Sequence, residues 1–135
     1  MVASTYSGGL QIGPINLWTP VVLAPMAGVT DVPFRRLCRE YSERGLSEAL
    51  ASKLDEAKKG VEAPAGLFVC EMITARALVE GSPKTWRMVE PDPSDRVRSA
   101  QLYGVDPDTM GRAAQMIVER DLVDHIDLNF GCPVP

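Results

Sequence analysis

The sequence predicts an α/β fold built around a parallel sheet. Short apolar runs recur along the chain, and segments with helical periodicity lie between them. The expected strands are residues 21–24, 67–70, 99–103 and 125–129. Strands that alternate with helices are typical of βα units, whose successive strands run parallel. The 135 residues are enough for one domain with a hydrophobic core.

The first expected element is a small β-hairpin over residues 10–17, with Gly13 and Pro14 at its turn. It precedes the first βα unit, and we expect it to cover the bottom of a barrel. A helix is predicted after the first strand, because four apolar residues fall at i, i+3, i+4 and i+7 on one helical face. These residues are Phe34, Leu37, Cys38 and Tyr41.

Another helix is predicted before the last strand, where apolar residues repeat the same spacing. They are Met110, Ala114, Ile117 and Val118. Asp106 is expected to cap this helix and Pro107 to occupy its first position. Asp108 follows near the positive end of the helix dipole, so the start of this helix is well defined.

The segment from about residue 42 to residue 65 is rich in alanine, glutamate and lysine. Leu46, Leu50 and Leu54 recur every four residues, and Gly60 can end a helix. We predict one short amphipathic helix here, inserted between the first helix and the second strand. It is either a solvated insertion or a lid that contacts a partner or RNA.

Composition narrows the class of protein. The three cysteines, Cys38, Cys70 and Cys132, are far apart, and the chain has one histidine, so no metal site is expected. We expect reduced thiols and a cytoplasmic location, with Cys38 and Cys70 in the core. No apolar run is long enough to span a membrane. The formal net charge of -4 argues against this segment providing the main grip on a nucleic acid.

Candidate site residues follow the expected strands. They are Pro25, Met26 and Ala27 after the first strand, Gln101 in the third, Asn129 at the end of the fourth, and Cys132 in a Gly-Cys-Pro turn. The carboxyl ends of parallel strands share one edge of a sheet, where ligands bind. Gln101 and Asn129 carry both donors and acceptors, which suits the polar edge of a heteroaromatic ring.

Each candidate also has a purely structural interpretation. Cys132 can be a small thiol in a tight turn, Gln101 can satisfy local backbone groups, and Met26 can be core packing. Glu71, after the second strand, is interpreted as orienting loop amides, and Arg35 belongs to a basic face that is expected to be solvated. The order of the candidates, each at the end of its own strand, favours a functional site.

Four stretches resemble the bacterial tRNA-dihydrouridine synthases of the DusB type. They are LAPMAGVTDVPFRRLCREY (residues 23–41), CEMITARALVEG (70–81), AQLYG (100–104) and HIDLNFGCPVP (125–135). The resemblance covers nearly the whole chain from about Ile12, apart from the 42–65 insertion.

The resemblance implies a (β/α)8 TIM barrel that carries FMN at its C-terminal mouth and is followed by a helical domain that helps to hold tRNA. NADPH would reduce FMN, and the enzyme would then reduce the C5=C6 bond of specific tRNA uridines. Pro25, Met26 and Ala27 would line the flavin, and Gln101 would bind its pyrimidine edge. Asn129 would hold the target uracil, and Cys132 would be the proton donor.

A complete barrel takes about 250 residues. We therefore expect residues 1–135 to be the N-terminal half of the FMN-binding barrel: four β/α units preceded by the hairpin, without the helical tRNA-binding domain. Two alternatives remain. One is a non-catalytic remnant that binds a partner or self-associates through open sheet edges, which flavin absorbance would distinguish. The other is an FMN barrel acting on a free pyrimidine, similar to dihydroorotate dehydrogenase, which an assay with NADPH and unmodified tRNA would distinguish.

Overall fold

The computed structural model describes residues 9–131 and contains seven strands in this range. The strands are β1 (Leu10–Ile12), β2 (Ile15–Leu17), β3 (Val22–Leu23), β4 (Glu62–Ala63), β5 (Leu67–Thr74), β6 (Ser99–Tyr103) and β7 (His125–Asn129). The helices are α1 (Val32–Arg44), α2 (Glu48–Ala51), α3 (Ala75–Val79), α4 (Pro83–Val89) and α5 (Pro107–Glu119), with a 3-10 helix at Leu54–Glu56. No helix in this range is both long and apolar enough to cross a membrane.

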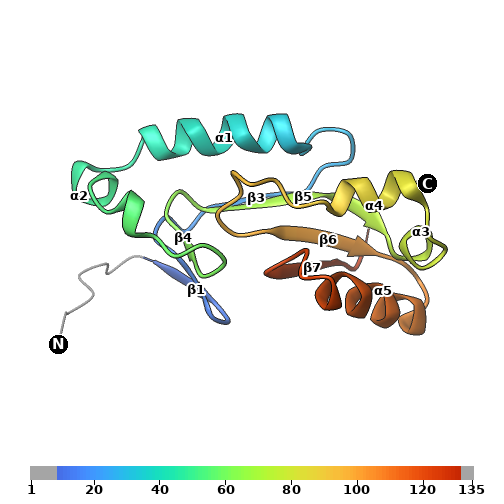
Figure 1. Ribbon diagram of the computed structural model, residues 1–135. Coiled ribbons are helices and arrows are strands. Elements are labelled where there is room, and N and C mark those ends of the chain that lie inside the picture. Colours follow the sequence, from blue (N-terminus) through green and yellow to red (C-terminus); the bar gives the residue numbers. More distant parts are fainter. Residues whose placement is uncertain (1–8, 132–135) are drawn as a thin grey trace.

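Strands β3, β5, β6 and β7 form one parallel sheet in that order (Figure 1). The predicted α/β class with a parallel sheet is therefore confirmed. β6 and β7 have the predicted bounds. β5 continues to Thr74, beyond the predicted end at Cys70, so Glu71 and Met72 lie within the strand and not after it.

The predicted hairpin is confirmed, because β1 pairs antiparallel with β2 from Leu10 and Leu17 to Ile12 and Ile15. β2 also pairs in parallel with β4. Ile15 and Leu17 are buried in a cluster with Leu67 at the beginning of β5. The hairpin thus covers the end of the sheet where the strands begin, far from α3 (Figure 1).

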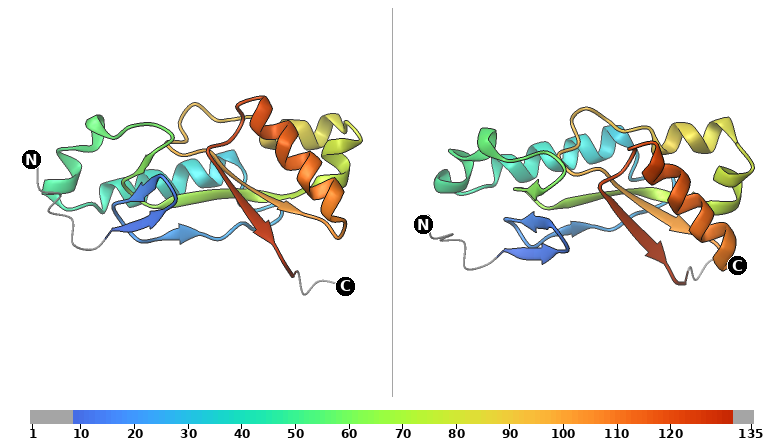
Figure 2. Two further views of the ribbon diagram at one scale, coloured as in Figure 1. Left: turned by 90° about the horizontal axis from the view of Figure 1, so that it is seen from below. Right: turned by 60° about the horizontal axis from the view of Figure 1, so that its bottom comes forward.

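The main core lies between the sheet and helices α3, α4 and α5. Its buried residues are Cys70, Ile73, Ala75, Leu78, Val89, Ala100, Leu102, Ala113 and Ile117. Both views of Figure 2 show α5 beside α3 and α4, with β7 at the edge of the sheet. The predicted cap of α5 is confirmed, because the Asp106 carboxylate accepts a hydrogen bond from the Thr109 N–H at 2.8 Å.

Helix α1 packs along the sheet through a charged face of the helix, and part of the apolar face of the helix is exposed. Leu37 is 50% exposed, whereas Arg35 is 4% exposed and Arg39 7% exposed. Both arginines form ion pairs of 3.0 Å with Asp95. The expectation that Arg35 belongs to a solvated face is therefore wrong. A guanidinium keeps its charge when buried, so each arginine needs a carboxylate at this position.

The prediction of a single amphipathic helix within residues 42–65 is also wrong. The segment contains only α2, the 3-10 helix and β4, and Leu46, Leu50 and Leu54 are all half-buried. Nucleating a helix is costly, and one that lacks a wide buried face does not gain enough packing to extend. Gly60, which was expected to end the helix, instead occupies a turn with a φ of 78°.

The buried ion cluster of Arg35, Arg39 and Asp95 allows a test of what holds α1 against the sheet. Replacing Asp95 with Ala leaves two buried guanidinium groups without a counter-charge, so we expect a loss of about 3–5 kcal/mol in the free energy of unfolding. Urea unfolding followed by circular dichroism measures this loss. The exposed Asp55→Ala control should change the free energy by less than about 0.5 kcal/mol. Equal effects of the two substitutions would show that the cluster does not stabilise the helix.

Candidate functional site

A row of polar side chains runs across the face of the sheet that is turned away from helices α3–α5. Ala100, Leu102 and Ile126 belong to the core beneath these helices, so the alternate residues of β6 and β7 point to the other face. This polar row consists of Ser99 and Gln101 from β6 and His125, Asp127 and Asn129 from β7. In-register pairing places Ser99 opposite His125 and Gln101 opposite Asp127.

Gln101 and Asn129, which were predicted from separate strands, lie in contact. The Asn129 Nδ2 donates a hydrogen bond to Gln101 Oε1 at 3.3 Å. Gln101 Nε2 donates to the Asp127 carboxylate. Gln101 is only 8% exposed, so its amide is both buried and fully oriented by its two neighbours. The structure thus joins two of the predicted site residues through direct contact.

Asn129 makes two further hydrogen bonds at the end of β7. Its Nδ2 donates to Met72 Sδ at 3.1 Å, and its Oδ1 accepts from the Gly131 N–H at 2.9 Å. The second contact ties the Asn129 side chain to the loop that leads to Cys132. Cys132 itself lies outside the described residues, so its predicted catalytic role remains a prediction.

A β-bulge in β5 links this row to the loop after β3. The register shifts from Cys70 opposite Ala100 to Met72 opposite Gln101, so Glu71 is the extra residue. The Glu71 carboxylate accepts a hydrogen bond from the Gly28 N–H at 2.6 Å. The interpretation that Glu71 orients a loop amide is therefore confirmed.

The loop that contains Pro25, Met26 and Ala27 is closed by Thr30. The Met26 N–H donates to the Thr30 hydroxyl at 2.9 Å, and the Thr30 N–H donates to the Met26 carbonyl at 3.0 Å. Thr30 is fully buried, while Met26 is 40% exposed and Ala27 is exposed. The loop is therefore rigid at its base and presents small and apolar groups at its tip.

The candidate residues do not all meet directly. No hydrogen bond between described residues joins Pro25, Met26 or Ala27 to Gln101 or Asn129. The connection passes instead through Glu71 and its neighbour Met72. Sequence reasoning missed Asp127 and Thr30. A signal existed for Asp127, because it lies two residues before Asn129 and so shares its face of the strand.

Two other titratable groups have structural roles. The His125 ring Nδ1 lies 2.8 Å from the Ser99 hydroxyl, and burial lowers the pKa of His125 although the Asp127 carboxylate opposes the shift. Burial raises the pKa of the Cys70 thiol to about 11, so this thiol is protonated and inert near neutral pH. Cys70 is therefore a core residue, as predicted.

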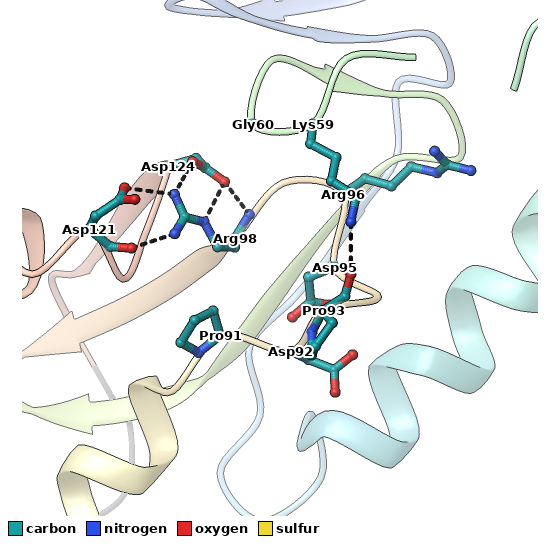
Figure 3. A pocket seen from close by; sticks show the side chains of 10 residues that line it. All are labelled: Lys59, Gly60, Pro91, Asp92, Pro93, Asp95, Arg96, Arg98, Asp121 and Asp124. Atoms are coloured by element: carbon teal, nitrogen blue, oxygen red, sulfur yellow. Dashed lines mark hydrogen bonds and ion pairs between the residues drawn. The ribbon is translucent and has the colours of Figure 1, made fainter. Parts of the chain in front are cut away.

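A polar pocket of about 350 Å³ lies at the other end of the sheet, near Gly60 and the beginnings of β6 and β7 (Figure 3). Figure 3 shows Arg98 pointing toward Asp121 and Asp124, and its ion pairs with them measure 3.0 and 2.6 Å. These ion pairs neutralise Arg98 within the pocket. Within residues 9–131, no cluster of three or more histidine, cysteine or acidic side chains could hold a metal.

Comparison with known proteins identifies relatives along nearly the whole chain. The chain is 53% identical over 129 residues to a probable tRNA-dihydrouridine synthase of Mycobacterium tuberculosis, a match that covers 96% of this chain and 29% of the relative. A probable tRNA-dihydrouridine synthase of Mycobacterium leprae is 52% identical over 84% of this chain and 31% of its own length. tRNA-dihydrouridine synthase B of Pseudomonas aeruginosa is 37% identical over 92% of this chain and 30% of its own length.

The chain therefore spans about three tenths of the length of the curated relatives it matches. No solved structure gives a significant match. The family model for dihydrouridine synthase matches residues 22–135, which include every predicted site residue. This match covers most of the sequence and agrees with the relatives, so the chain belongs to the dihydrouridine synthase family.

Proposed function

We propose that the protein carrying this chain reduces specific uridines in tRNA to 5,6-dihydrouridine, with FMN as cofactor and NADPH as reductant. The observation that carries the proposal is the contact between Gln101 and Asn129 on the polar face of the sheet. Membership of the dihydrouridine synthase family supports it. The named relatives act on tRNA, which favours this substrate over a free pyrimidine.

The residues on this face fit one edge of a flavin. Gln101 uses one amide hydrogen toward Asp127 and one lone pair toward Asn129, which leaves one donor and one acceptor. A flavin pyrimidine edge offers a carbonyl next to an N–H, which matches this pair. Met26 and Ala27 present exposed apolar surface to a flat ring. When bound, reduced FMN would supply the hydride that uracil C6 receives.

Reduction at C6 leaves negative charge at C5, which must then receive a proton. Cys132 lies three residues beyond Asn129 and is the proposed donor. A thiol can act as this general acid only while it is protonated. In this proposal Asn129 holds the uracil, and Cys132 transfers its Sγ proton to C5. The target uridine has to leave its stack to reach the site, as in other base-modifying enzymes.

The complete protein is proposed to form a (β/α)8 barrel with a helical tRNA-binding domain and to act in the cytoplasm. Residues 1–135 would be the first half of that barrel. Two observations support further chain packing against them: Leu128 on the edge strand β7 is 47% exposed, and Leu37 on α1 is 50% exposed. With a net charge of -4, the chain would leave most of the tRNA contact to other parts of the protein.

The same exposed apolar side chains favour a second candidate for the chain in isolation. A non-catalytic piece with open strand edges would self-associate and lack flavin. Size-exclusion chromatography with absorbance at the flavin wavelengths distinguishes the two. A yellow monomer supports a working site, whereas a colourless oligomer supports the second candidate.

A direct assay tests the main proposal. Incubating the complete gene product with NADPH and unmodified tRNA should convert uridine into dihydrouridine, detected by mass spectrometry of the digested tRNA. Free uracil and free orotate should give no turnover under the same conditions. Turnover of a free pyrimidine without any dihydrouridine in tRNA would refute the proposed substrate.

Replacing Cys132 with Ala should keep the flavin spectrum and lose most tRNA reduction. The expected loss is about 100- to 10,000-fold, the usual contribution of a positioned general acid. The control is Cys38→Ala, which removes a half-buried thiol from α1. Turnover in Cys132→Ala that matches this control would mean that another group supplies the proton.

The Glu71–Gly28 hydrogen bond gives a test of the proposed flavin site. Glu71→Ala frees the loop that carries Pro25, Met26 and Ala27. We therefore expect FMN to bind about 10- to 100-fold more weakly, since a hydrogen bond to a charged group contributes about 1.5–3 kcal/mol. Flavin fluorescence titration measures the change. Glu80→Ala is the matched control, because Glu80 forms an ion pair with the exposed Arg76 on α3. Equal FMN affinity in both variants would exclude the loop from the flavin site.

A further inference from the structure

The side chains of Asp127, Gln101 and Asn129 form a hydrogen-bond chain with a fixed direction. Gln101 Nε2 donates to Asp127, Asn129 Nδ2 donates to Gln101 Oε1, and the Gly131 N–H donates to Asn129 Oδ1. An amide side chain can be turned over, since its two ends are similar in shape. A carboxylate cannot, because an ionised carboxylate only accepts hydrogen bonds.

The Gly131 N–H can only donate and the Asp127 carboxylate only accepts, so the two ends agree in direction, and Asp127 sets it from the Gln101 side. Its carboxylate requires the NH2 group of Gln101, so the Gln101 carbonyl must face Asn129. That carbonyl in turn requires the NH2 group of Asn129, which leaves the Asn129 carbonyl for Gly131. Gln101 is 8% exposed, so water does not compete freely for its amide and the direction is maintained.

We propose that Asp127 is a positioning residue that, through Gln101, holds Asn129 in one amide orientation and thereby fixes the Gly131 backbone immediately before Cys132. This inference rests on the proposed function for its effect on the reaction. Its structural part, the orientation of Asn129 and Gly131, stands on the hydrogen bonds alone.

The orientation has a consequence for the base that Asn129 faces. The Asn129 nitrogen donates to Gln101 Oε1 and to Met72 Sδ, so both of its hydrogens are used. Only the second lone pair of Asn129 Oδ1 remains for a ligand. An acceptor at this point matches the N3–H of uracil and is repelled by the unprotonated N3 of cytosine. Asp127 thus contributes to selecting uracil without touching it.

The test uses Asp127→Asn in the complete gene product. Asparagine has nearly the same shape, but it offers a donor as well as an acceptor, so the amides of Gln101 and Asn129 can turn over. The control is Asp108→Asn, which makes the same charge change on the exposed first turn of α5. Each variant is compared with wild type by one spectroscopic and one kinetic measurement.

The spectroscopic measurement follows the Gly131 amide. Labelling with 13C-carbonyl phenylalanine and 15N-glycine selects glycines that follow phenylalanine, and Phe130–Gly131 is the one such pair among the 135 residues. The resonance is assigned by its loss in Gly131→Ala. In Asp127→Asn it should move upfield as the hydrogen bond to Asn129 Oδ1 weakens, while Asp108→Asn should leave it in place. An unmoved resonance in Asp127→Asn would overturn the inference, whether or not the protein makes dihydrouridine.

The kinetic measurement separates the two half-reactions. Oxidation of the reduced flavin by tRNA should slow about 10- to 100-fold in Asp127→Asn, as small misplacements of a positioned group do. Reduction of the flavin by NADPH should slow by a much smaller factor, because Asn129 and Cys132 act on the uracil and not on NADPH. A general loss of structure would instead slow both steps alike. A shifted Gly131 resonance with an unchanged ratio of the two rates would overturn the functional part. A wild-type protein that makes no dihydrouridine would refute the proposed function but not the positioning.

A double variant, Asp127→Asn with Gln101→Glu, keeps the net charge and moves the acceptor-only group to position 101. The carboxylate placed there again requires the NH2 group of Asn129, so the Gly131 resonance should return toward its wild-type position. This variant also serves if Asp127→Asn alone does not fold, because it restores the buried carboxylate within the same row. A resonance that stays displaced in the double variant would overturn the inference.

Discussion

In-register parallel pairing of β6 with β7 is the constraint on which the polar face depends. It brings Ser99 level with His125 and Gln101 level with Asp127, so every second residue of each strand meets a partner on the same face. The alternate residues, such as Leu102 and Ile126, join the core beneath the helices. A slip of one residue in either strand would bury the polar side chains and expose the apolar ones. The same register therefore specifies both the core and the candidate site.

A second set of contacts connects the scaffold to the loop that contains Pro25, Met26 and Ala27. Asp95 holds Arg35 and Arg39 of α1, and Arg35 Nη1 donates to the Thr30 carbonyl at 2.9 Å. The Thr30 hydroxyl in turn accepts from the Met26 N–H. The position of this loop thus depends on a buried ion cluster as well as on the strand that precedes it. This arrangement explains why α1 turns a charged face inward while Leu37 faces out.

Sequence patterns predicted correctly the elements that depend on interactions between residues close together in the sequence. The hairpin at Gly13, the cap at Asp106 and both ends of β6 and β7 follow from turn chemistry and periodicity. Periodicity failed for residues 42–65, where leucines at helical spacing lie in a four-residue helix and a 3-10 turn. Periodicity also could not predict that Gln101 would contact Asp127 and Asn129. That contact depends on how β6 pairs with β7, and paired residues of these strands lie 26 positions apart in the sequence. Residue types identified the amides of the candidate site, but only the fold showed that Gln101 donates to the Asp127 carboxylate.

The bulge in β5 has a consequence for how this family can vary. Met72 faces the polar row because one extra residue, Glu71, separates it from the buried Cys70. Exchanging a side chain here alters one contact. Losing Glu71 would instead leave a regular pairing, with Met72 still opposite Gln101 and Ile73 still in the core, but without a carboxylate to accept from the Gly28 N–H. The extra residue is thus a requirement of the contact with the loop after β3 and not of the core, so variation that keeps this contact should enter the strand as substitutions, while gaps should fall in the connecting loops.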